Sequence, residues 1–170
     1  MAEALLADRL AALGSAATVR SSGMLGDGEP PHPEAITAMA GFGLDISAHR
    51  SRRVIAQDLE AADLTLAMAR ENLRHAVVTA PAAWPRAFTL RELVRRGEVV
   101  GQRGPEESLA AWLARAHHGR ERAALLGDSP TDDVADPAGG PPDGYAETAT
   151  ILSGLLDRLV GLCWQSGESG

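Results

Sequence analysis

The acidic segment of residues 128–140 holds the side chains of this sequence most suited to acid–base chemistry, because four aspartates fall within nine residues. Asp136 is followed by Pro137, and a proline fixes the backbone beside a carboxylate, so that it can hold the acid over a reacting group. A helix-loop-helix calcium site is excluded, since Val134 and Ala135 occupy positions where ligands are required. We therefore predict a solvated loop that presents Asp136.

Sulfur and imidazole groups offer few other candidates. Cys163 is the only cysteine, and its leucine-rich surroundings predict a buried, inert thiol. His117 and His118 are adjacent, so on a helix they point about 100° apart and do not chelate one metal; both are predicted to be exposed. One cysteine excludes internal disulfides and multi-cysteine metal sites. No metal or organic cofactor is implied.

Composition narrows the possible partners. The formal net charge is −7 and arginine supplies all the side-chain positive charge, which argues against a nucleic-acid partner. No apolar run approaches the roughly 20 residues that span a bilayer, so no membrane association is expected. The lone cysteine and the lack of a recognisable signal peptide point to the cytoplasm. The length of 170 residues fits a single domain, residues 1–170.

Hydrophobic periodicity predicts alternating helices and strands. Helices are expected over residues 1–13, 33–42, 56–62, 71–79, 91–96, 108–126 and 143–164, and strands over 17–21, 64–68 and 87–90. Such alternation implies an α/β, three-layer fold with a small parallel sheet flanked by helices. The first helix lacks a capping side chain before it, which predicts that the N-terminus is cut.

Four segments, in order along the chain, resemble the bacterial low-molecular-weight protein-tyrosine phosphatase family. They read Met-Ala-Glu-Ala-Leu-Leu (residues 1–6), Val-Arg-Ser-Ser-Gly (19–23), His-Arg-Ser-Arg (49–52) and Asp-Pro (136–137). Residues 28–35, 62–68 and 88–93 are also similar to that family. The resemblance covers the single domain except for residues 97–133, an insertion that is atypical of the family.

The resemblance carries a mechanism. In the family, a Cys-x5-Arg-Ser-Pro loop directly precedes the helix that here begins at Met1. Its cysteine attacks phosphorus, its arginine and amides hold the phosphate, and the Asp-Pro aspartate protonates the leaving oxygen. The resemblance implies that Asp136 is the general acid and that Ser22 and His49 support the loop. The implied partner is a phosphorylated protein or a small phosphomonoester.

The family's sheet order is 2-1-3-4, so the resemblance also implies that central strand 1 and the cysteine loop are missing from this chain. The two neighbouring strands would then lie roughly 9 to 10 Å apart. The chain is accordingly expected to be an inactive, poorly stable phosphatase, explained by a start codon assigned too late. The oligomeric state cannot be read from the sequence.

Alternatives to an ordinary phosphatase stay open. One is a non-catalytic interaction protein on the same scaffold, and a weaker one is an arsenate reductase, which would need further cysteines. A preference for phosphotyrosine is doubtful, because Ala138 follows Pro137 and residues 24–29 contain no aromatic side chain.

Overall fold

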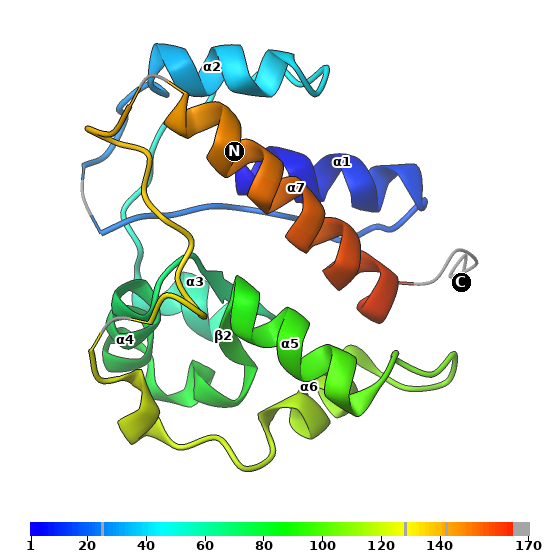
Figure 1. Cartoon of the computed structure of the whole chain (residues 1–170). Helices are drawn as coiled ribbons and strands as arrows, with labels where there is room; N and C mark the ends of the chain where they lie inside the picture. The colour runs from blue at the N-terminus through cyan, green and yellow to red at the C-terminus, as the bar shows by residue number, and fades with distance from the viewer. Residues whose placement is uncertain (25, 128, 142, 165–170) are drawn as a thin grey trace.

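The computed structural model describes residues 1–24, 26–127, 129–141 and 143–164 (Figure 1). Within these residues, the chain forms helices and two short strands. In chain order the elements are α1 (Ala2–Ala12), α2 (Pro33–Ala40), α3 (Ala56–Ala61), β1 (Thr65–Ala67), α4 (Arg70–Thr79), the 3₁₀ helix η1 (Pro81–Arg86), β2 (Ala87–Thr89), α5 (Leu90–Val100), α6 (Leu109–His117), the 3₁₀ helix η2 (Arg122–Leu125) and α7 (Gly144–Cys163).

The sheet consists of β1 and β2, which run parallel with Leu66 opposite Phe88. The chain between them forms α4 and η1, the kind of crossover that parallel strands require. Ala87, Phe88 and Thr89 are all buried, which fits a strand covered by helices. The predicted α/β fold with a small parallel sheet flanked by helices is confirmed.

The prediction of a strand over residues 17–21 is wrong. Residues 15–22 are extended but pair with no strand of the described chain, and the nearest ladder contact is an isolated parallel bridge between Gly23 and Arg53. Two amides in this segment bond to side chains instead: Ala17 N–H donates to Ser15 Oγ at 3.3 Å, and Ser21 N–H donates to Glu3 at 3.0 Å. A strand needs a partner backbone, but this extended segment runs between helices, with α1 and α7 above it and α5 below it in Figure 1.

The main core joins two groups of helices. In Figure 1, α1, α2 and α7 form the upper group, while α5 and α6 lie below with the sheet. Leu152, Leu156 and Leu159 of α7 are buried in this core, and the same cluster contains Phe88 of β2 and Trp112 of α6. Cys163 is fully buried in the same cluster, as predicted.

Residues 97–133 do not contain the single helix predicted over residues 108–126. Helix α6 ends at His117, Gly119 takes a left-handed φ of 73°, and the chain resumes as η2. Glycine adopts this conformation without the steric cost that other residues incur, so it ends the helix. None of the described helices is both long and apolar enough to cross a membrane.

Candidate functional site

The loop that carries Asp136 is attached to the carboxyl end of β1. The amide of Val134 donates to the carbonyl of Met68 at 2.7 Å, and Val134 is 6% exposed. Two residues later Asp136 is exposed, and its Oδ1 accepts a hydrogen bond from the Ala138 amide at 3.0 Å. Asp136 makes no ion pair within the described chain. Its carboxylate therefore stands at the surface, in a loop anchored on one side by a strand.

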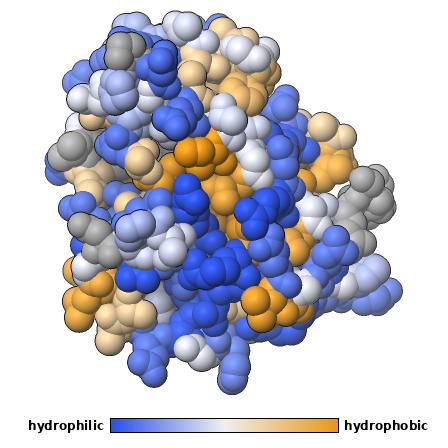
Figure 2. Space-filling model, viewed as in Figure 1, coloured by the Kyte–Doolittle hydropathy of each residue, from blue (hydrophilic) through white to orange (hydrophobic). Residues whose placement is uncertain are grey.

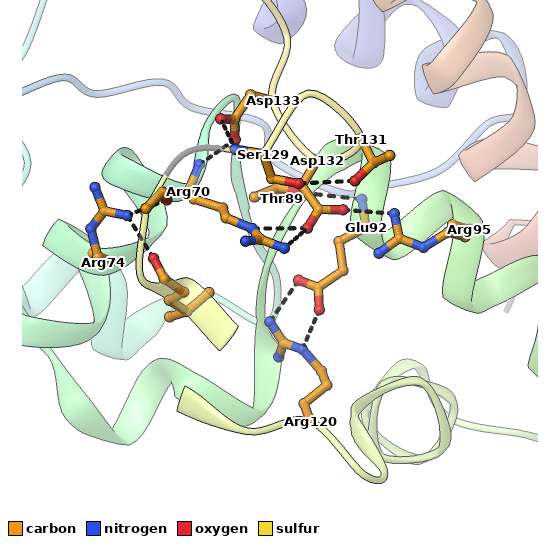
Figure 3. A network of polar contacts seen from close by, with 12 residues as sticks. Arg70, Arg74, Thr89, Glu92, Arg95, Arg120, Ser129, Thr131, Asp132 and Asp133 are labelled. Atoms are coloured by element: carbon orange, nitrogen blue, oxygen red, sulfur yellow. Dashed lines mark hydrogen bonds and ion pairs between the residues drawn. The ribbon is translucent and has the colours of Figure 1, made fainter. Parts of the chain in front are cut away.

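Asp132 and Asp133, in the same loop, do not behave as the solvated residues that the sequence predicts. Asp132 is 4% exposed, and its Oδ2 accepts from Arg70 Nε and Nη2 at 3.0 and 2.7 Å. Arg95 Nη1 reaches Asp132 Oδ1 at 2.6 Å from the opposite side (Figure 3). Asp133 accepts from the Arg70 and Ser129 amides at 2.7 and 2.9 Å. These bonds fasten the loop to α4 and α5.

The charge of Asp132 is stabilised by these arginines. Burial alone raises the pKa of a carboxyl group, but the hydrogen bonds from Arg95 and Arg70 outweigh it and hold the pKa of Asp132 below its ordinary value. The carboxylate is thus ionised at neutral pH. The segment just before Asp136 is held by buried ionic bonds.

A second cluster forms around Glu3, in the first turn of α1. The Ser21 amide donates to Glu3 Oε2 at 3.0 Å and the Ser21 hydroxyl donates to the same oxygen. His49 Nδ1 lies 3.7 Å from Glu3 Oε2. The structure therefore joins His49 to Ser21 through Glu3. Ser22 is exposed and its hydroxyl makes no hydrogen bond within the described residues.

Neither His49 nor Ser22 contacts Asp136 by a hydrogen bond or ion pair in the described structure. The three residues singled out by sequence thus lie on three separate segments. Sequence reasoning missed Glu3, whose only signal is its acidic side chain in the first turn of a helix.

Sequence reasoning also missed an aromatic side chain beside the Asp136 loop. Tyr145, in the first turn of α7, stacks on His32 with ring centroids 5.1 Å apart and an interplanar angle of 6°. Burial raises the pKa of Tyr145, and the negative charges of Asp136 and Glu34 raise it further. An aromatic surface accordingly lies within electrostatic range of Asp136, although Ala138 follows the Asp-Pro pair.

The model of the low molecular weight phosphotyrosine protein phosphatase family matches residues 1–100. The chain belongs to this family.

Solved structures agree with this assignment. A low molecular weight protein tyrosine phosphatase from T. tengcongensis is 31% identical, with a TM-score of 0.68 over 94% of this chain and 86% of that one. The YwlE arginine phosphatase from Geobacillus stearothermophilus is 23% identical, with a TM-score of 0.65 over 93% and 79% of the two chains. The Erwinia amylovora tyrosine phosphatase amsI is 15% identical, with a TM-score of 0.67 over 96% and 83%. The last two show a shared fold. No curated protein sequence matches the chain.

The protonation state and accessibility of Cys163, the one thiol of this family member, decide whether that thiol can act as a nucleophile. Burial raises the pKa of Cys163 to about 12, and the nearby positive charge of Arg103 offsets only part of that rise. A nucleophilic cysteine needs to be an accessible thiolate, and Cys163 is protonated and enclosed at neutral pH. No group of three or more metal-binding side chains occurs among residues that the structure describes.

Proposed function

We propose that this chain provides the scaffold and the proton donor of a phosphomonoester hydrolase that works through a cysteinyl-phosphate, with Asp136 as general acid. One observation carries the proposal: the Asp136 carboxylate is exposed and forms no ion pair with the described residues, in a loop that Val134 anchors to the end of β1. A general acid must reach the leaving oxygen of the substrate while its own loop stays in place. His49 and Ser22 are proposed, in line with the family, to support the phosphate-binding loop.

We propose in addition that the 170 residues alone do not turn over phosphomonoesters. Their one cysteine is the buried Cys163, and no Cys-x5-Arg sequence occurs among them. The nucleophile and the phosphate-binding groups each supply a large part of the barrier lowering in such enzymes, so an acid by itself is insufficient.

A non-catalytic interaction protein on the same scaffold is the second candidate. It is favoured by the same unreactive thiol, because binding a phosphorylated protein needs no nucleophile. The proposed partners are a phosphorylated protein in this case and a phosphorylated protein or small phosphomonoester for the hydrolase. A cytoplasmic location is proposed for both.

The test compares the chain with a version in which a strand and the family's Cys-x5-Arg-Ser-Pro loop are joined directly before Met1. We expect the chain itself to leave an aryl phosphate intact and the extended version to hydrolyse it. Asp136→Asn should slow the extended version by a factor of about 100 or more, the usual size of a general-acid effect. Asp143→Asn is the matched control, because Asp143 is another exposed aspartate whose side chain caps no helix.

Robust hydrolysis by the unextended chain that disappears in Asp136→Asn would contradict the proposed inactivity. If Asp136→Asn leaves the hydrolysis rate of the extended version unchanged, Asp136 is not the general acid. The assay should also include a phosphoarginine peptide, since the similar Geobacillus stearothermophilus protein is named an arginine phosphatase.

A further inference from the structure

A cavity of about 260 Å³ lies between α4, α5 and η2, and none of Asp136, Ser22 and His49 lines it. Four arginines and three carboxylates form its polar wall. Figure 2 shows strongly hydrophilic side chains gathered over α5 on this face. In a chain of net charge −7, a concave surface on which guanidinium groups outnumber carboxylates differs from the rest of the molecule.

Two of the four arginines make bonds within the chain that stabilise the fold. Arg120 is paired with Glu92 through two hydrogen bonds of 2.7 and 2.8 Å and lies 3.9 Å from the centroid of the Trp84 ring. Arg96 donates to the carbonyls of Ala116 and His118. These side chains shape the cavity and add positive charge to it.

The other two arginines share one carboxylate. Arg70 binds Asp132 Oδ2, while Arg95 uses only Nη1 to bind Asp132 Oδ1 (Figure 3). The single negative charge of Asp132 is thus shared by two guanidinium groups. The side chain of Arg95 is 52% exposed, and its Nε and Nη2 have no partner among the described residues. A guanidinium with free donors in a fixed fork is suited to binding an oxyanion.

The third carboxylate, Glu121, stands at the exposed rim of the cavity and forms no ion pair in the described structure. It opposes an incoming anion without holding any arginine. Glu121 therefore gives a way to change the charge of the cavity without disturbing a bond that supports the fold.

We propose that this cavity binds a small oxyanion, a phosphoryl or carboxylate group, through Arg95 and the shared charge of Arg70. The volume of about 260 Å³ is below the roughly 300–1,000 Å³ of pockets for larger organic ligands, which points to a compact anion. Binding here is independent of the proposed hydrolase chemistry, because it uses neither Asp136 nor a thiolate.

The experiment is titration calorimetry of the full chain with sodium pyrophosphate, and separately with sodium citrate, against sodium chloride at matched ionic strength. We expect saturable binding of at least one of the two anions at millimolar concentration. Tighter binding of pyrophosphate assigns a phosphoryl group, and tighter binding of citrate assigns a carboxylate. No saturable binding of either anion overturns the proposal.

Four variants locate the bound anion. Arg95→Ala should weaken binding at least tenfold, whereas Arg158→Ala should change it less than twofold, because Arg158 is 53% exposed and likewise paired with one carboxylate, Glu98. Glu121→Gln should tighten binding, and this variant removes no side-chain hydrogen bond or ion pair among the described residues. Equal losses in Arg95→Ala and Arg158→Ala, or loss in Asp136→Ala, would show that the anion binds elsewhere and overturn the assignment.

Discussion

Arg120 and Glu92 form a two-pronged ion pair in which Nε–Oε1 is 2.7 Å and Nη2–Oε2 is 2.8 Å, with side chains only 2% and 13% exposed. Removing one charge of a buried pair leaves the other uncompensated, so Glu92→Gln is expected to lower the free energy of unfolding by about 3 kcal/mol.

The control for that variant is Glu98→Gln, also on α5. Glu98 pairs with Arg158 at the surface, where both side chains are about half exposed, and such pairs contribute about 0–1 kcal/mol. Urea unfolding followed by circular dichroism measures both variants. Similar losses in the two would show that burial of the Arg120 pair does not matter.

The lowered pKa of Asp132 predicts that the folded chain loses stability in acid. Because its pKa in the folded chain is lower than in the unfolded chain, the carboxylate stabilises the fold above the unfolded value of about 3.9 and this contribution disappears as pH falls through the folded pKa. Asp132→Asn should therefore cost about 3 kcal/mol at neutral pH and much less in strong acid.

Unfolding midpoints measured from pH 7 downward test this expectation. Asp157→Asn provides the comparison, because Asp157 is an exposed partner of Arg9 with a side chain 62% exposed. A loss for Asp132→Asn that stays constant with pH would be inconsistent with an ionised Asp132 in the fold.

The surroundings of Gly97 and Gly154 predict opposite effects of an alanine substitution on stability. A Cβ at Gly97 would lie 2.9 Å from Leu162 Cδ1 and from the Trp112 ring, whereas a Cβ at Gly154 would meet no atom of the described residues within 4 Å. Gly97→Ala should destabilise the chain by about 1–3 kcal/mol through overpacking between α5, α6 and α7.

Gly154→Ala should instead stabilise it by up to about 1 kcal/mol, because alanine favours a helix interior. Thermal unfolding of the two variants decides the matter. A stabilised Gly97→Ala protein would mean that α5 does not pack on α7 as closely as the structure has it.

Cys163 is expected to resist modification. With its pKa raised to about 12, the folded thiol stays protonated, and its contribution to stability is complete below the unfolded value of about 8.5 and is lost as pH rises toward 12. A maleimide or disulfide reagent at pH 8 should react with the native chain only at the rate of unfolding, and quickly in denaturant. Rapid labelling of native protein would show that the thiol is accessible.

Features formed by residues that lie near one another in the sequence are the ones that the sequence predicts. The leucine stripe of the last helix predicted residues 143–164, and α7 runs over Gly144–Cys163, because helical periodicity is local. Pairing of residues 17–21 depends on a strand elsewhere, and the prediction of a strand there was wrong. Periodicity shows which residues are extended and not what they pair with.

The candidate site shows the same dependence on separation along the sequence. Asp136 was singled out because its Asp-Pro pair matches the family pattern, and its role as general acid stays a prediction. The burial of Asp132 was missed because its partners, Arg70 and Arg95, are 62 and 37 positions away. Similarly, the bond between Ser21 and Glu3 joins residues that are 18 positions apart. Specific long-range charge pairing leaves no periodic signal in the sequence.

The extended segment of residues 15–22 has a consequence for how the molecule meets its surroundings. Within the described chain, β1 is paired along one side only, and this segment offers further backbone donors and acceptors without a strand beside them. Open edges of this kind are where a foreign strand adds most readily. Self-association of this chain should accordingly begin by backbone pairing at its sheet, and it should increase with protein concentration even though the like charges of the molecules repel one another.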